Sequence, residues 1–251
     1  MSVYAISDLH GHYDIYQKVK EILTPNDIVY CLGDCGDRGP RGFETICAVY
    51  QDPQWIYIKG NHEDMLAKAL KEAYSNDYGY DTALLFNNGG HETYASFTAN
   101  NDCNSLLTWS NRLDNLSCYY EYRNKDGITI FLTHAGFTPK FDTNKQPWLT
   151  NDLLWDRSHF YNPIPSDLNN FVVVHGHTPR QYLQTRISEY FNNDIDTETR
   201  ILQQEKEDGP QGALWYANKH KVDIDCWTYY SKYATLLNLD TFEETIFISE
   251  E

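Results

Sequence analysis

The stretch Gly33-Asp34-Cys35-Gly36-Asp37-Arg38-Gly39 directly follows an apolar run at residues 28–32. A short apolar run of this kind is typical of a strand buried in a parallel sheet. Two carboxylates and a guanidinium therefore stand where the predicted strand ends. In open α/β sheets ligands bind at that edge. Taken alone, the stretch could equally be a solvated acidic turn, so its meaning depends on what flanks it.

Matching polar clusters flank this stretch on both sides. The predicted strand 3–6 leads to Asp8 and His10, and the predicted strand 55–58 leads to Asn61. Apolar spacing predicts helices after each strand, at residues 14–23, 41–50 and 64–73. This β-α-β-α-β-α order indicates an α/β protein with a parallel sheet, and right-handed crossovers bring the three clusters to one edge. We expect Asp8 and His10 to point the same way, as alternate residues of an extended strand end do.

The remainder of the chain supplies further strand ends. Short helices and turns are expected over residues 74–117. A hairpin is predicted at 119–122 and 128–132, ending at His134, and a buried strand at 171–174 leads to His175 and His177. Residues 184–211 are polar and largely acidic, which predicts an inserted surface helix or loop. The last predicted strands, expected to be antiparallel members of a second sheet, are at residues 221–225, 234–239 and 245–248.

Composition limits the class of protein. The chain has 251 residues, of which 41% are hydrophobic, enough for a single domain over residues 1–251 with a substantial core. The net charge of −16 argues against nucleic acid as a partner. No apolar run is long enough to cross a membrane and no signal peptide precedes the first strand, so we expect a cytoplasmic protein. Six cysteines without a CxxC pair are expected to be buried, reduced thiols.

The strand-end groups have the chemistry of a dinuclear metal site. They comprise two carboxylates, one amide and three imidazoles: Asp8, His10, Asp34, Asn61, His134 and His177. Six such ligands, one of them a carboxylate that two ions can share, suit two divalent cations with open positions. Oxygen and nitrogen donors without thiolate favour Mn, Fe or Zn in a catalytic rather than a structural role. Arg38 adds a planar group that matches phosphate oxygens.

Five motifs carry a family resemblance from residue 3 to about 179. They are Ser-Asp-Leu-His-Gly at 7–11, the stretch at 33–39, Gly-Asn-His-Glu at 60–63, His-Ala-Gly at 134–136 and Gly-His-Thr-Pro at 176–179. Together they resemble the PPP-type, calcineurin-like metallophosphatases, which include eukaryotic serine/threonine phosphatases, lambda phage phosphatase and bacterial diadenosine tetraphosphatases. Residues 88–90 and 153–157 favour the phage and bacterial branch. The resemblance implies a β-sandwich flanked by helices, with two metals at the carboxyl ends of the strands.

The resemblance also implies roles for individual residues. Asp8 and His10 would hold one metal ion, Asp34 would bridge, and the other ion would be held by Asn61, His134 and His177. Arg38, Asn61 and Arg157 would contact the phosphate. His62 would protonate the leaving oxygen, and Asp37 would orient the imidazole ring of His62. Glu63 would not bind metal itself but would hold the ligands in position. The nucleophile would be a metal-bridging hydroxide, with Mn²⁺ the favoured ion and Fe or Zn as alternatives.

Three functions remain open at this point. The leading one is a phosphoprotein phosphatase acting on Ser/Thr, and by extension Tyr, as a monomer on phosphorylated proteins or small phosphoesters. The alternative is a symmetrical bis(5'-nucleosyl)-tetraphosphatase, and the third is a catalytically silent binding module. His12 is expected to be a loop residue, and His175 either a site residue or a packed histidine. The aromatic residues Trp227, Tyr229 and Tyr230 replace a usually glycine-rich region and leave the substrate range open.

Overall fold

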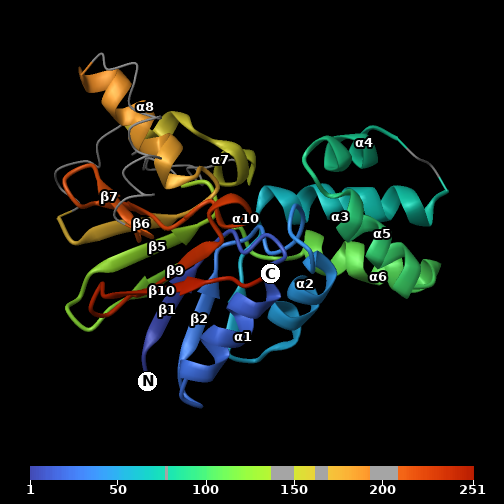
Figure 1. The fold of residues 1–251 in the computed structure, drawn as a ribbon, viewed down its shortest axis with the longest axis horizontal. Coiled ribbons are helices and arrows are strands. Elements are labelled where there is room, and N and C mark those ends of the chain that lie inside the picture. Colours follow the sequence, from blue (N-terminus) through green and yellow to red (C-terminus); the bar gives the residue numbers. More distant parts are fainter. Residues whose placement is uncertain (77–78, 137–149, 162–168, 193–208) are drawn as a thin grey trace, which may run out of the picture.

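The fold is given by a computed structural model that describes residues 1–76, 79–136, 150–161, 169–192 and 209–251 (Figure 1). Two five-stranded mixed sheets form a sandwich, and helices cover its outer faces. This confirms the predicted α/β class and the helix-flanked sandwich. No helix within the described ranges is both long and apolar enough to cross a membrane. The cysteines are all free, as predicted, but burial is confirmed only for Cys31, Cys35 and Cys226, since Cys47 and Cys118 are half-buried and Cys103 is exposed.

The first sheet contains the parallel core predicted for the beginning of the chain. Its strand order is β10-β9-β1-β2-β3, with β1, β2 and β3 parallel. The bounds are β1 Val3–Ile6, β2 Ile28–Cys31, β3 Trp55–Tyr57, β9 Tyr233–Asn238 and β10 Glu244–Ile248. The assignment of 234–239 and 245–248 to a second sheet was wrong. The strand β9 pairs antiparallel with β1 instead, and β10 pairs with β9 to form the edge of the first sheet.

The second sheet has the order β4-β5-β6-β8-β7, and its strands β5, β6 and β8 are parallel. The bounds are β4 Tyr119–Arg123, β5 Thr129–Thr133, β6 Phe171–His175, β7 Leu214–Tyr216 and β8 Lys221–Asp223. The predicted hairpin is confirmed as the antiparallel pair of β4 and β5. The parallel strands β5 and β6 direct their carboxyl ends toward the same edge as β1–β3, which brings His134 and His177 to the first three clusters.

The helices follow the predicted pattern closely. The first sheet carries α1 Tyr13–Ile22, α2 Gly42–Gln51 and α3 Asn61–Tyr74, and α3 packs against α6 and α4. The others are α4 Tyr80–Asn87, α5 His91–Asn100, α6 Cys103–Asp114, α7 Thr150–Trp155, the 3₁₀ helix η1 Ser158–Tyr161, α8 Arg180–Asn192 and α10 Thr228–Ser231. The acidic segment predicted at 184–211 begins within α8, and its residues 193–208 lie outside the described part of the chain.

Two hydrophobic cores fix the sandwich. One lies between the sheets, where Ala5 and Leu237 of the first sheet meet Leu132 and Val174 of the second. The other lies between the first sheet and its helices. Alternate residues of β1 and β2 face these two cores, as the two-residue period of a strand requires. Burial on both sides therefore holds the strand ends, and with them the polar clusters, in a fixed relation.

The helix α3 begins three residues earlier than predicted, and the reason is the side chain of Glu63. Its Oε2 accepts hydrogen bonds from the backbone N–H of Gly60 at 2.9 Å and of Asp34 at 2.8 Å. Its Oε1 accepts from the N–H of Cys35 at 3.0 Å and from the hydroxyl of Tyr57 at 2.7 Å. Glu63 thus caps α3 and ties it to the loop after β2. Asn61 and His62 consequently lie in the first helical turn rather than at a strand end.

Replacing Glu63 with Gln should lower the free energy of unfolding by about 2–3 kcal/mol, the range for hydrogen bonds to a charged acceptor. The reason is that one carboxylate oxygen becomes an NH₂ group that faces donors. Urea denaturation of the manganese-loaded protein measures the change. Glu44→Gln, at an exposed position on α2, is the control and should stay within about 0.5 kcal/mol of wild type. Equal effects of the two substitutions would contradict the assigned capping role.

Candidate functional site

The loops that follow β1 and β2 adopt a left-handed backbone at the predicted ligands. The φ angles are +54° at Asp8, +43° at His10 and +54° at Asp34. The expectation that Asp8 and His10 alternate along an extended strand was therefore wrong. The N–H of Asp8 donates to Gly33 O at 3.1 Å and that of His10 to Asp34 O at 3.0 Å, so the two loops support each other. Strained backbone of this kind clusters at functional sites.

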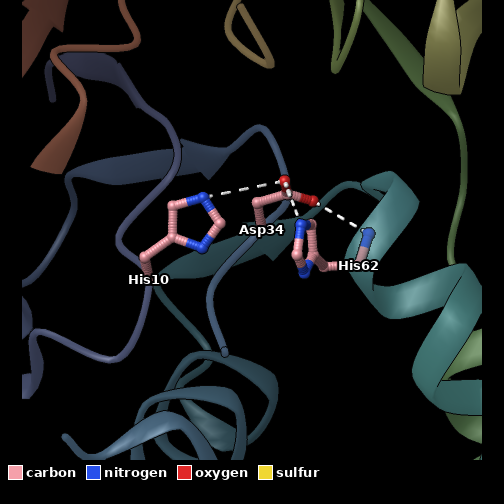
Figure 2. Close-up of side chains that lie close together, drawn as sticks. All are labelled: His10, Asp34 and His62. Carbon is pink, nitrogen blue, oxygen red and sulfur yellow. Dashed lines mark hydrogen bonds and ion pairs between the residues drawn. The ribbon is translucent and has the colours of Figure 1, made fainter. Parts of the chain in front are cut away.

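Asp34 lies at the centre of the cluster, as Figure 2 shows for two of its neighbours. Its Oδ2 is 3.9 Å from His10 Nε2 and 3.8 Å from His62 Nε2, and its Oδ1 is 3.4 Å from His134 Nε2. The N–H of His62 donates to Oδ1 at 3.1 Å. Gly60 is required beside it, because a Cβ at that position would collide with Asp34 Oδ1. Both oxygens of this carboxylate thus face imidazoles from different elements.

On one side of Asp34, Asp8 and His10 each direct one potential metal-binding atom toward the cluster. The Oδ2 of Asp8 accepts from the Ser7 hydroxyl at 2.5 Å and from the N–H of His177 at 3.0 Å. The other carboxylate oxygen of Asp8, Oδ1, faces His10 Nε2 at a distance of 3.9 Å. His10 Nδ1 lies 3.0 Å from Gly36 O, so Nδ1 carries the proton and the Nε2 lone pair points into the cluster.

On the other side, three side chains from both sheets converge. The amide Oδ1 of Asn61 lies 2.8 Å from His134 Nε2 and 3.0 Å from His177 Nδ1. His134 Nδ1 is 2.8 Å from Leu32 O, which again leaves Nε2 free to act as a donor to a cation. Ligand atoms of Asp34, His134 and His177 all lie within 4.8 Å of one another. The structure therefore brings all six predicted ligands together.

The charges of this cluster call for a cation. Burial and the nearby carboxylates of Asp8 and Glu63 raise the pKa of Asp34 well above its usual value. Burial also lowers the pKa of His10 and of His177 well below normal, so both rings are neutral. The buried Nε2 of His62 has no hydrogen-bond partner among the residues the structure describes. Neutral imidazoles beside buried carboxylates fit divalent metal ions with oxygen and nitrogen ligands.

Two exposed arginines flank the buried cluster. Arg38 NH1 lies 2.9 Å from His10 Nε2, and the backbone N–H of Arg38 donates to Gly89 O at 3.0 Å. Arg157 donates from Nε to the hydroxyl of Thr178 at 3.1 Å, next to the ligand His177. One guanidinium group therefore lies beside His10, and the other lies on the side of His177. The loop at 88–90, noted in the sequence only as a branch marker, is what supports Arg38.

His62 and Asp37 form a buried pair beside Asp34. His62 Nδ1 lies 2.6 Å from Asp37 Oδ2, and the N–H of Asp37 donates to the Thr93 hydroxyl at 3.0 Å. Burial raises the pKa of Asp37 to about 7, and burial together with Arg38 lowers the pKa of His62. Because the two groups are in direct contact, the protonation state of each depends on that of the other. The Nε2 atom of His62 faces Asp34, and it is from this atom that the ring can transfer a proton.

Two histidines outside the predicted ligand set lie in positions that the sequence analysis allowed, and one neighbour of the site was missed. His175 is buried and bonds through Nε2 to the hydroxyl of Tyr216 at 2.7 Å, so it is a packed histidine behind the cluster. His12 is also buried, and its Nδ1 contacts the Ser249 hydroxyl at 3.2 Å rather than the cluster. Tyr229 was missed as a site neighbour, although its ring lies against both His10 and Arg38. Its unusual position in a region expected to be glycine-rich was the available signal.

Comparison with known proteins agrees with this geometry. Residues 1–224 match the calcineurin-like phosphoesterase family, so the chain belongs to that family. It is therefore a metallophosphoesterase. The branch within the family is not resolved by this match.

Individual proteins that resemble this chain include two tetraphosphatases and one protein-tyrosine phosphatase of similar fold. A symmetrical bis(5'-nucleosyl)-tetraphosphatase from Nitrosococcus oceani is 34% identical over 150 residues, covering 57% of this chain and 46% of the relative. One from Legionella pneumophila strain Lens is 28% identical over 161 residues, covering 61% and 51%. The chain thus spans about half the length of the curated relatives it matches. The fold is also similar to a cold-active protein-tyrosine phosphatase of a Shewanella species (TM-score 0.57, 16% identity, 98% of this chain and 77% of that one).

Replacing Asp34 with Asn should weaken the stabilisation that metal gives. At a free Mn²⁺ concentration 100 times Kd, one bound ion stabilises the wild type by about 2.7 kcal/mol, and the variant should gain less because the central charge is lost. Urea unfolding with chelator and with Mn²⁺, together with elemental analysis, measures this. Asp27→Asn is the control, since Asp27 is a buried carboxylate at the opposite end of β2. A variant that keeps two ions and the full gain would refute the assignment.

Proposed function

We propose that the six converging ligands hold two divalent metal ions and that the chain hydrolyses a phosphoester or phosphoanhydride bond beside them. The observation that carries this proposal is the convergence of Asp8, His10, Asp34, Asn61, His134 and His177 on one buried cluster with guanidinium groups at its rim. When bound, the metals supply Lewis-acid stabilisation of charge on the reacting phosphate. We propose Mn²⁺ as the ion, with Fe or Zn as alternatives.

The remaining residues have complementary roles in this proposal. Arg38 and Arg157 bind the phosphate oxygens from the two sides, and the amide of Asn61 assists. A planar guanidinium fits such oxygens with paired hydrogen bonds. His62 donates a proton from Nε2 to the leaving oxygen, while Asp37 holds its ring through the 2.6 Å contact at Nδ1. Glu63 contacts no substrate in this scheme and keeps the loops in place.

For the substrate, we propose a dinucleoside tetraphosphate cleaved symmetrically. Support comes from the curated relatives in Nitrosococcus and Legionella, which carry that name and share about half their length with this chain. The phosphoprotein phosphatase predicted from the sequence rests on the motifs alone. The phosphatase of similar fold is too distant in sequence to indicate a substrate. We further propose that the chain acts as a monomer.

Manganese-loaded protein should convert diadenosine tetraphosphate into ADP alone, because symmetrical hydrolysis breaks the central anhydride. Anion-exchange chromatography separates ADP from the AMP and ATP that asymmetric cleavage gives. A phosphoserine peptide assayed at the same concentration should turn over more slowly. The control is Asp34→Asn protein from the same preparation, which excludes a contaminating hydrolase. Formation of AMP and ATP, or faster release of phosphate from the peptide, would overturn the substrate assignment.

One observation favours phosphomonoesters as a second candidate. A tetraphosphate carries several charges, whereas other cations near the cluster are already engaged. Arg41 pairs with Glu251 at 3.1 Å, and Lys59 pairs with Asp114 at 3.4 Å. A substrate with a single phosphate needs no more than Arg38 and Arg157. The affinity for a dinucleoside tetraphosphate would therefore have to include contacts with its uncharged parts.

The proton-donor role of His62 predicts a dependence on the leaving group. His62→Asn should lose little on nitrophenyl phosphate, whose leaving anion is stable. It should lose up to roughly 10²–10⁴-fold on an alkyl ester such as phosphoserine peptide, which needs the proton. Asp37→Asn should give the same trend more weakly. The measurement is kcat/KM on both substrates with metal content determined in parallel. Equal losses on the two substrates, with metals retained, would make His62 a phosphate-binding residue instead.

A further inference from the structure

Three aromatic side chains of the turn between β8 and β9 stand at the rim of the candidate site. We call Trp227, Tyr229 and Tyr230 the aromatic corner; Figure 1 shows its short helix, α10, at the edge where the strands end. The ring of Tyr229 lies 5.6 Å from that of His10 and nearly perpendicular to it. The guanidinium carbon of Arg38 lies 5.0 Å from the centre of the Tyr229 ring. The corner is therefore continuous with both a predicted ligand and a predicted phosphate contact.

Trp227 and Tyr230 form the outer part of the aromatic corner, where their rings stack and one ring face stays exposed. The rings of Trp227 and Tyr230 are 4.6 Å apart and inclined by 26°. Trp227 is half-buried, and the centre of its ring lies 6.1 Å from that of Tyr229, with the two rings inclined by 80°. Tyr230 is 59% exposed although one face rests on Trp227, so its other face is open to solvent. Stacked aromatic rings with an accessible face are what planar ligands bind.

The backbone holds this pair in place at a conformational cost. Trp227 has φ +62°, which is rare for a bulky residue, and Lys232 at the end of α10 has φ +67°. The N–H of Trp227 donates to Asp225 Oδ1 at 2.7 Å, and the N–H of Asp225 donates to Asp223 Oδ1 at 3.0 Å. Both of these aspartates are buried. A strained turn pinned by buried carboxylates presents the rings with little entropy left to lose on binding.

The charge of the protein indicates which planar group the aromatic corner binds. The chain carries a net charge of −16, and Arg41 and Lys59 are already paired, so contacts with uncharged groups would add to the affinity that the metals and two arginines give a polyphosphate. The nucleobases are the uncharged planar groups of a dinucleoside polyphosphate. A base is separated from the β-phosphate only by its ribose and the α-phosphate. Trp227 connects Tyr230 to Tyr229, and Tyr229 adjoins Arg38, so a base on Tyr230 and a phosphate on Arg38 would occupy one continuous row of side chains.

We propose that the open face of Tyr230, backed by Trp227, stacks one nucleobase of the substrate and so selects nucleotides over simple phosphoesters. This inference rests on the proposed function and specifies how its substrate is recognised. Stacking is tolerant of base identity, because every base has a π-face. The site should therefore accept adenine and guanine dinucleotides with similar affinity. Tyr229 connects the two parts by keeping Arg38 beside the phosphates.

The test compares Tyr230→Ala, Tyr230→Trp and the control Tyr80→Ala, which removes a 76% exposed tyrosine from α4. ADP is titrated into the manganese-loaded protein by calorimetry, with inorganic diphosphate as the probe that lacks a base. Tyr230→Ala should weaken ADP binding roughly tenfold, within the range for loss of one base–aromatic stack. The change for diphosphate should be much smaller. Tyr230→Trp should restore ADP binding, and Tyr80→Ala should resemble wild type.

The ratio of kcat/KM for diadenosine tetraphosphate to that for nitrophenyl phosphate should fall by a similar factor in Tyr230→Ala. If ADP and diphosphate weaken equally, the tyrosine is structural and the inference is wrong. If instead only a phosphotyrosine peptide loses affinity, the corner binds an aromatic side chain and the inference is again wrong. If wild type binds ADP through Tyr230 but does not cleave the tetraphosphate, the proposed substrate fails while the base-stacking site stands.

Discussion

The structure depends on placing a buried carboxylate, Asp34, among other carboxylates and neutral imidazoles. Such a group is expensive to bury unless charge or hydrogen bonds compensate it. The surrounding fold supplies part of this compensation. Glu63 fixes the backbone on both sides of Asp34, and the first turn of α3 donates an N–H to it. These hydrogen bonds leave part of the negative charge uncompensated. The cluster therefore favours the binding of cations, unlike an ordinary polar core.

The predicted ligands come from both halves of the sandwich, so their separation depends on the apolar core between the sheets. Asp34 and Asn61 follow strands of the first sheet, whereas His134 and His177 follow strands of the second. The core between the sheets, with Ala5, Leu132 and Val174, sets their separation. Close packing transmits small changes of volume. A substitution in this core is thus expected to be felt at the site even though no ligand is touched.

Much of the fold and site could be predicted because periodicity and motifs are local signals. The β-α repeats placed Asp34 after its strand and Asn61 at the same sheet edge, although Asn61 begins a helix there, and the hairpin before His134 was clear from its turn. The placement of β9 could not be predicted, because pairing partners of late strands depend on long-range packing. The left-handed backbone at Asp8 and the helical position of His62 were also missed. The first involves the hydrogen bond of Asp8 to Gly33 O, between loops distant in sequence. The second depends on Glu63, whose bonds to Asp34 and Cys35 also join segments far apart in the chain.

The position of α8 has a consequence for how this protein could diverge. The chain leaves the site after His177, enters α8 at Arg180, and returns to the second sheet at β7. No predicted ligand, phosphate contact or proton donor lies in the sequence between those points. Insertions there would add surface beside the reaction centre without moving any group that performs chemistry. Lineages can thus change which molecules reach a shared hydrolytic core by altering one excursion of the chain, while selection on the core stays intact.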